Sequence, residues 1–139
     1  MNGAKLNAAQ TRRLRAAAKA VPFFRLLAIE VVEVTSGNAT LSLEVRKELT
    51  QNHGVVHGGA IASLIDSAMA FAIIPLLAPK ERVTTVDLTI SYLRPLTKGR
   101  ATATAKVVKS GRRLFVVTAD VLDNDGRLAA TSLSTYIKL

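Results

Sequence analysis

The sequence predicts an α+β domain in which an antiparallel β-sheet wraps around one long, buried helix. The segment from residue 58 to residue 77 carries apolar side chains on nearly all of its sides, which is typical of a helix enclosed by other elements. The segments around it alternate apolar with polar residues, as half-buried strands do. The predicted order is a helix, two strands, the long helix and four strands, so an antiparallel sheet must cover the long helix.

The first predicted element is a helix that begins after Asn7. Asn7 can cap its N-terminus, and Gln10 stands three residues later as the partner in a capping box. Pro22 is expected to end this helix. Its apolar face is thin and rich in alanine, so we expect a helix that packs or frays at the N-terminus rather than one that inserts into a membrane. We predict an N-terminal helical extension over residues 1–25 and a main domain over residues 26–139.

Two strands and a polar loop lead from this extension to the long helix. Valines interleaved with glutamates predict the first strand, and a Ser-Gly-Asn turn separates it from a second strand of clear alternation. Pro75 and Pro79 are expected to end the long helix. The predicted ranges are 27–35 and 39–46 for the strands and 47–57 for the loop.

Four further strands complete the chain. Gly111-Arg112-Arg113 and Asn124-Asp125-Gly126 mark the turns between the last three, and the second of these is a strong hairpin signal. In the first of the four strands, strict alternation places Val86 on one face and both Thr85 and Asp87 on the other. The predicted strands cover residues 83–94, 100–110, 114–123 and 127–138.

Length and composition limit the function classes. A chain of 139 residues is one domain with room for a substantial core. It contains no cysteine, which excludes disulfides, thiolate metal sites and a cysteine nucleophile, and which fits a reducing compartment. The chain is 49% hydrophobic, with a mean hydropathy of +0.27. We expect apolar surface buried in an oligomer, although a strongly apolar core would also account for these values.

The net charge of +9 raises the possibility of nucleic-acid binding. Six of the 19 basic residues precede the first acidic residue, Glu30, so much of the excess belongs to the N-terminus. Only 4% of the residues are aromatic, which leaves little for stacking on bases. A small molecule that bears phosphate groups explains the positive charge more economically, and no nucleic-acid partner is predicted.

No targeting or membrane-spanning segment is expected. The basic N-terminus has no continuous apolar stretch of the kind that secretory signals contain. The longest apolar run, from Ala68 to Ala78, contains Pro75 and is too short to cross a bilayer. We therefore expect a soluble, cytoplasmic protein without a membrane partner.

The segment from Gln51 to Asp66 is the most informative part of the chain. A polar loop passes through His57, Gly58 and Gly59 into the long helix. The first N–H groups of such a helix are free to bind a ligand, and they favour negative charge. Asp66 lies two turns further along, where a carboxylate is costly to bury. Together these features predict a site that stabilises an oxyanion and supplies a carboxylate as nucleophile or base.

This architecture with this loop resembles the hotdog-fold acyl-CoA thioesterases. The most similar groups are the PaaI-type thioesterases of phenylacetate degradation and one class of 4-hydroxybenzoyl-CoA thioesterase. The resemblance spans residues 26–138 and rests on an amide residue, the pattern Gly-x-x-His-Gly-Gly, an acid on the helix and a later Tyr-x-x-Pro. The residues that carry it are Gln51, Gly54, His57, Gly58, Gly59, Asp66, Tyr92 and Pro95.

The resemblance implies catalytic roles for five residues. Gly58 would polarise the thioester carbonyl through its backbone N–H, and Asp66 would act as nucleophile or general base. Gln51 matches the amide position, and Thr85 matches a hydroxyl that positions water in some members. Other members place a threonine one turn after the acid, where this chain has Ala70. His57 would either hold the loop or help to polarise the carbonyl.

The resemblance also implies acyl-CoA as the substrate, with no further cofactor and no metal. Coenzyme A carries phosphate groups that need cations at the mouth of the pocket. In the family, a dimer shares each active site between subunits, and paired dimers form tetramers. The candidate CoA-binding residues lie at strand ends and turns and are Arg94, Lys98, Arg100, Lys109, Arg112 and Arg113.

Several alternatives remain open at this level. Asp66 could be a structural carboxylate bound by Ser63 or Ser67. The protein could bind or sense acyl-CoA without hydrolysing it, or it could be a hotdog dehydratase or hydratase. The acyl tunnel is expected along the helix face near Ala62, Met69, Ala70 and Ile73, where small residues favour a medium-to-long or aromatic acyl group.

Overall fold

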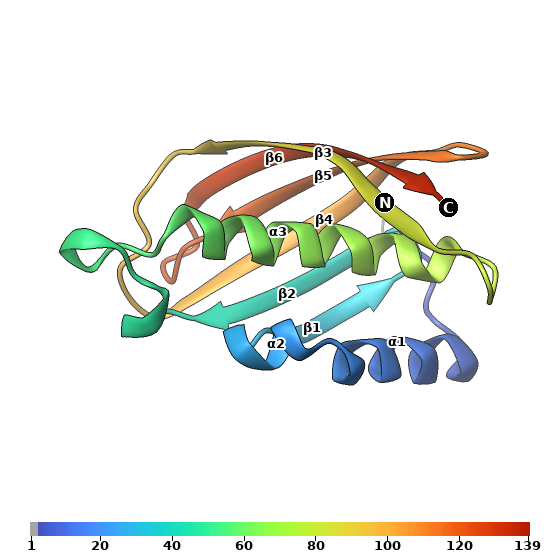
Figure 1. Ribbon diagram of the computed structural model, residues 1–139, viewed down its shortest axis with the longest axis horizontal. Coiled ribbons are helices and arrows are strands. Elements are labelled where there is room, and N and C mark those ends of the chain that lie inside the picture. Colours follow the sequence, from blue (N-terminus) through green and yellow to red (C-terminus); the bar gives the residue numbers. More distant parts are fainter. Residues whose placement is uncertain (1–2) are drawn as a thin grey trace.

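A computed structural model describes residues 3–139 as a curved antiparallel sheet with one long helix across its face (Figure 1). Three short 3₁₀ segments, Lys47–Leu49, Asn52–Gly54 and Ile74–Leu76, flank the long helix α3. The helices are α1 (Ala8–Ala20), α2 (Pro22–Leu27) and α3 (Gly58–Ile73). The strands are β1 (Glu30–Thr35), β2 (Asn38–Glu44), β3 (Val83–Tyr92), β4 (Arg100–Ser110), β5 (Leu114–Leu122) and β6 (Leu128–Lys138).

The six strands form one sheet in the order β1-β2-β4-β5-β6-β3, and every pairing is antiparallel. Strands β1 and β3 are its edges. This arrangement confirms the predicted α+β architecture of a sheet wrapped around a central helix, and it is the hotdog fold. The order also places β3, which follows α3 in the chain, beside the last strand.

Small side chains let the helix approach the sheet closely. Strand β4 directs Ala101, Ala103 and Ala105 inward, and each is at most 1% exposed. The facing side of α3 carries the larger residues Leu64 and Ile65, both fully buried. Helix α3 and the short turn after it are long and apolar enough to cross a membrane, but here the helix packs against β2, β4 and β5 as a core helix.

The N-terminal region contains two helices where one was expected. Asn7 and Gln10 form the predicted capping box of α1. Pro22 does end α1, but it also begins α2, because its fixed φ suits the first turn of a helix. Ala28 then closes α2 with a left-handed φ of 52°. The predicted strand 27–35 was therefore placed too early, and β1 begins only at Glu30.

Both N-terminal helices pack against the rest of the protein. The Arg13 guanidinium donates to the carbonyl of Leu77 at 3.1 Å, and Leu14 is buried. On α2, the ring of Phe24 packs against Phe71 of α3 with 5.2 Å between the ring centroids. The helical extension is thus docked, and the proposed domain boundary at residue 26 stays a prediction.

A β-bulge at Val86 changes which side chains of β3 face the helix. The pairing with β6 shifts between Thr85 and Asp87, so these two residues point to opposite faces. The predicted strict alternation was wrong here, and Val86 is 58% exposed. The Asp87 carboxylate accepts from the Thr135 N–H at 2.8 Å and so replaces a backbone bond that the bulge disrupts. Thr85 is thereby turned toward α3.

Candidate active site

The N-terminus of α3 is organised by its own first residues. The Nδ1 atom of His57 accepts a hydrogen bond from the Gly59 N–H at 2.8 Å, so His57 caps the helix. A Cβ on Gly59 would lie 3.0 Å from that Nδ1, so this glycine makes room for the cap. The Gly58 N–H makes no hydrogen bond with any of residues 3–139.

A pocket of about 350 Å³ opens beside Gly58. The Tyr92 hydroxyl donates to the Gly58 carbonyl at 3.0 Å, and the Tyr92 ring lies 3.3 Å from where a Cβ on Gly58 would be. A side chain at residue 58 would therefore crowd the Tyr92 ring, and glycine keeps the backbone N–H accessible from the pocket. The pocket is lined by Gln51, Val55, Val56, Gly58, Ile61, Tyr92, Leu93, Arg94, Pro95 and Leu96.

The loop before α3 is held by backbone bonds, which leave the Gln51 side chain available. The Gln51 N–H donates to the Val55 carbonyl at 2.8 Å, and the Val56 N–H donates to the Leu96 carbonyl at 2.9 Å. His53 takes a left-handed φ of 65° at the exposed tip of the loop. The structure therefore brings Gln51 and Gly58 to the same pocket, as the motif predicted.

Asp66 lies in the middle of α3, where two hydroxyl groups bind its carboxylate. The Thr85 hydroxyl of β3 donates to Oδ1 at 2.8 Å, and the Tyr136 hydroxyl of β6 donates to the same oxygen at 2.5 Å. Ser63 and Ser67 bond to helix carbonyls instead, which overturns the alternative that they hold Asp66. Thr85 and Tyr136 are neighbours because they pair across β3 and β6.

Tyr136 was not found by the sequence reasoning. It is 2% exposed and was counted only as part of the last strand. Burial, together with the hydrogen bond to Asp66, raises the pKa of the Tyr136 hydroxyl far above its ordinary value, so the group stays protonated. Its only sequence signal is that an inward-facing tyrosine at the end of a strand needs a buried hydrogen-bond partner.

The two parts of the site are too far apart to act together within one chain. Gly58 and Asp66 are separated by eight residues of one helix, which corresponds to about 12 Å along its axis. A carbonyl bound at Gly58 is therefore out of reach of the same chain's carboxylate. One subunit therefore does not bring the Gly58 N–H and the Asp66 carboxylate to the same reacting carbon.

The six basic residues proposed for CoA binding occupy two ends of the sheet. At the end near Gly58, Arg94 lines the pocket and donates to the Leu128 carbonyl at 2.8 Å, and Lys98 lies in the exposed loop before β4. Lys109, Arg112 and Arg113 lie at the opposite end, where β4 turns into β5. The structure thus separates these cations into two groups and brings only Arg94 into contact with the pocket.

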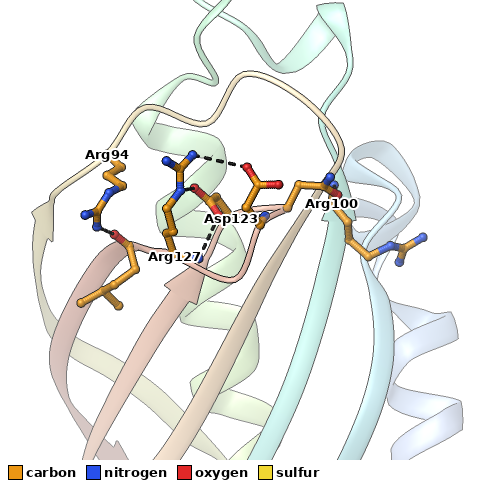
Figure 2. A network of polar contacts seen from close by, with 7 residues as sticks. Arg94, Arg100, Asp123 and Arg127 are labelled. Carbon is orange, nitrogen blue, oxygen red and sulfur yellow. Dashed lines mark hydrogen bonds and ion pairs between the residues drawn. The ribbon is translucent and has the colours of Figure 1, made fainter.

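Arg100, the sixth of these candidate residues, forms ion pairs within the sheet. Its guanidinium contacts the carboxylates of Glu30 at 2.8 Å and Glu44 at 2.9 Å, and the hydrogen bond to Glu30 raises its pKa further. Figure 2 shows the Arg100 side chain extending away from Arg94 and from the β5–β6 hairpin. In that hairpin, Arg127 binds Asp123 at 3.0 Å, and hydrogen bonds from the backbone of residue 127 lower the pKa of Asp123.

The expected tunnel residues divide between two faces of α3. Met69 and Ile73 are fully buried in the core of this subunit, and their place in an acyl tunnel stays a prediction. Ala62 and Ala70 are half-buried and share the face that carries Asp66. Among residues 3–139, no three His, Asp or Glu side chains come together in the way that metal ligands do.

Comparison with known proteins assigns the chain to a family. The model of the thioesterase superfamily matches residues 53–130. That range includes His57, Gly58, Asp66 and Thr85 and covers more than half of the chain. The chain belongs to this superfamily, and the protein is a thioester hydrolase of the PaaI-like hotdog type.

Individual relatives agree with this assignment. A Saccharolobus solfataricus protein with an esterase name is 32% identical over 85% of this chain and 84% of its own length. The medium/long-chain acyl-CoA thioesterase YigI of Salmonella typhimurium is 26% identical over 84% of this chain and 85% of its own length.

Two solved structures share the fold. A thioesterase family protein from Silicibacter pomeroyi is 30% identical with a TM-score of 0.89, over 94% of this chain and 98% of that one. The phenylacetic acid degradation protein PaaI of Thermus thermophilus, in a mutant form, is 31% identical with a TM-score of 0.79, over 86% of this chain and all of that one.

Proposed function

We propose that the protein hydrolyses acyl-CoA thioesters at sites shared between two subunits. The observation that carries this proposal is the division of the site along α3. One chain offers a free Gly58 N–H in an open pocket, and it holds the Asp66 carboxylate two turns away. A two-fold dimer with antiparallel central helices would bring the Gly58 of one subunit to the partner subunit's Asp66.

The pocket half of the site would bind and polarise the thioester carbonyl. The Gly58 N–H stands at the positive end of the α3 dipole, where a developing oxyanion is stabilised. The Gln51 side chain lines the same pocket and can donate a second hydrogen bond to substrate. His57 would support this arrangement by holding the start of the helix, because its Nδ1 is used by the helix cap.

The carboxylate half would supply the attacking oxygen. Asp66 either attacks the carbonyl carbon to form an anhydride, which water then hydrolyses, or removes a proton from an attacking water. In both routes a C–O bond forms, the C–S bond breaks, and CoA leaves as a thiolate that takes up a proton. A thiol ionises near pH 8.5, so the leaving group needs no dedicated acid. The Thr85 hydroxyl oxygen lies beside the carboxylate and can accept a hydrogen bond from water.

The acyl group is proposed to be medium-to-long or aromatic. Ala62 and Ala70 flank Asp66 on the half-buried face of α3 and leave room for an extended chain. The Salmonella relative is named for medium- and long-chain acyl-CoA. Arg94 and Lys98 are the best placed of the six candidate cations for the CoA phosphates, because they lie at the Gly58 end of the sheet. A tetramer of paired dimers and a cytoplasmic location remain predictions.

The test is thiol release from a panel of acyl-CoA esters, from acetyl through palmitoyl and including aromatic esters, with Asp66→Ala alongside. Release by the wild type and not by the variant supports the proposal, and the best substrate defines the acyl site. A preference for acetyl-CoA would contradict the proposed acyl class. No release from any ester, together with measurable acyl-CoA binding, would favour a binding protein that does not catalyse hydrolysis.

A further inference from the structure

We infer that Tyr136 is a positioning residue, which fixes the Asp66 carboxylate so that one defined oxygen faces the substrate. This inference rests on the proposed function, because it assigns a task to Asp66. Tyr136 does not reach the pocket at Gly58, and it acts only through the carboxylate.

The geometry assigns different roles to the two carboxylate oxygens. Thr85 and Tyr136 both donate to Oδ1, at 2.8 Å and 2.5 Å. Oδ2 of Asp66 makes no hydrogen bond with any of residues 3–139. Two donors on one oxygen hold the carboxylate plane against rotation. Oδ2 is therefore the oxygen left free to attack the acyl carbon or to accept the proton of water.

Tyr136 also fixes the carboxylate relative to the helix backbone. Its hydroxyl lies 2.9 Å from the Asp66 carbonyl oxygen as well as 2.5 Å from Oδ1. A single phenolic proton thus bridges the backbone and the side chain of the same residue, with the shorter contact to the side chain. Because Tyr136 pairs with Thr85 across the sheet, both donors are anchored by strand hydrogen bonds and not by a loop.

The donor keeps its proton under all ordinary conditions. The ring is buried, and the hydroxyl contacts a carboxylate, so ionisation would place two negative charges side by side. Tyr136 is thus a permanent donor to Asp66 and not a proton carrier. The second tyrosine, Tyr92, is half exposed, and its hydroxyl donates to a neutral backbone carbonyl, so it offers an internal contrast.

A spectroscopic experiment tests this contact without requiring enzymatic activity. The chain has two tyrosines and no tryptophan, so Tyr92→Phe leaves Tyr136 as the only strong near-ultraviolet chromophore. A phenol that donates to a carboxylate absorbs at longer wavelength than one that donates to a neutral group. Adding Asp66→Asn to Tyr92→Phe should shift the Tyr136 band to shorter wavelength. An unchanged band in a folded double variant would overturn the inference.

A kinetic experiment tests whether the Tyr136 hydroxyl contributes to turnover through Asp66. Tyr136→Phe removes the hydroxyl with little change in shape, so kcat should fall at least about tenfold while KM changes little, since misplacing a reacting group is costly. Thr85→Val should also lower kcat, and Thr85→Ser should restore it. Thr131→Val is the matched control, because Thr131 makes a similar bond to Asp120 at 2.7 Å on an exposed strand face away from the site.

The outcomes separate this inference from the proposed function. A wild-type protein that hydrolyses no ester contradicts the proposed function, whereas the spectroscopic result still decides whether Tyr136 holds Asp66. A folded Tyr136→Phe variant with wild-type kcat contradicts the inference and leaves the proposed function standing. If Tyr136→Phe does not fold, the absorption shift decides alone.

Discussion

The N-terminus and the middle of helix α3 differ in the groups that surround them. At the beginning, loop and backbone groups surround an open pocket, and the key donor is a peptide N–H. In the middle, side chains from α3, β3 and β6 close around a carboxylate. The first region is suited to admit a ligand, and the second is suited to hold one group still.

The contrast supports the proposal that a single subunit carries two incomplete parts of an active site. No carboxylate from residues 3–139 lines the pocket at Gly58. The groups that donate to the Asp66 carboxylate are two hydroxyls and not a backbone N–H. The parts are about 12 Å apart on one rigid helix, so bending cannot bring them together. We propose that a second copy completes each site, and separate variants test each region.

The largest expected effect is that of removing the carboxylate charge. Asp66→Asn should lower turnover by at least about 10²-fold, the usual contribution of an essential acid or base. Asp120→Asn is the matched control, because Asp120 also accepts from a strand threonine, Thr131, but on an exposed face. Steady-state thiol release measures both variants. Equal activities for the two variants would remove Asp66 from the mechanism.

The next effect distinguishes the two adjacent glycines. Gly58→Ala keeps the N–H but places a Cβ 3.3 Å from the Tyr92 ring, so activity should fall about tenfold with the fold intact. Gly59→Ala places a Cβ 3.0 Å from Nδ1 of His57, so it should lower stability more than activity. Measuring kcat/KM and thermal unfolding for both variants checks that Gly58→Ala mainly lowers activity and Gly59→Ala mainly lowers stability. The reverse pattern would contradict the assigned roles.

A smaller effect tests His57 as a cap. His57→Ala should lower the free energy of unfolding by about 1 kcal/mol, as the loss of an N-cap does, and His57→Asn should restore most of it. The two variants should have similar kcat once folded. Urea unfolding and thiol release give the two readouts. A large loss of kcat in both variants with unchanged stability would instead support direct polarisation of the carbonyl by His57.

The smallest effect is a dependence of stability on alkaline pH. The pKa of Tyr136 is raised in the folded protein, mainly by burial, so folding favours the protonated phenol. Its stabilising contribution is complete below the unfolded pKa of about 10 and is lost as the pH rises above that value. Tyr136→Phe should flatten this decline. Urea unfolding of both proteins between about pH 8 and about pH 11 measures the difference.

Local patterns made much of this molecule predictable. Alternation located β4 at its observed bounds and the last two strands within one residue at each end, and the Asn124-Asp125-Gly126 turn separates them. The Gly-rich loop and Asp66 could be found because their motif is contiguous. Asn7 was recognised because its capping partner lies only three residues away.

Features that depend on distant pairing were missed. Tyr136 and Asp66 are 70 residues apart in the sequence, and no local pattern near either residue predicts their contact. The bulge at Val86 reverses the alternation of β3, so Thr85 was assigned to the wrong face although its candidate role was named. Arg100 was treated as a free cation because Glu30 and Glu44 come from two other strands.

The most direct test of the shared site is complementation between two inactive variants. Asp66→Asn and Gly58→Val are prepared separately, refolded together at equal amounts, and assayed for thiol release. In a mixed dimer, one site combines both altered residues, and the other combines the intact Gly58 of one subunit with the partner subunit's intact Asp66.

Random pairing would make half of the dimers mixed, each with one working site, so the account predicts recovery to about a quarter of wild-type activity. Circular dichroism of each parent variant confirms that folding is intact. Activity that stays at the level of the separate variants, although mixed dimers are shown to form, would contradict a site shared between subunits.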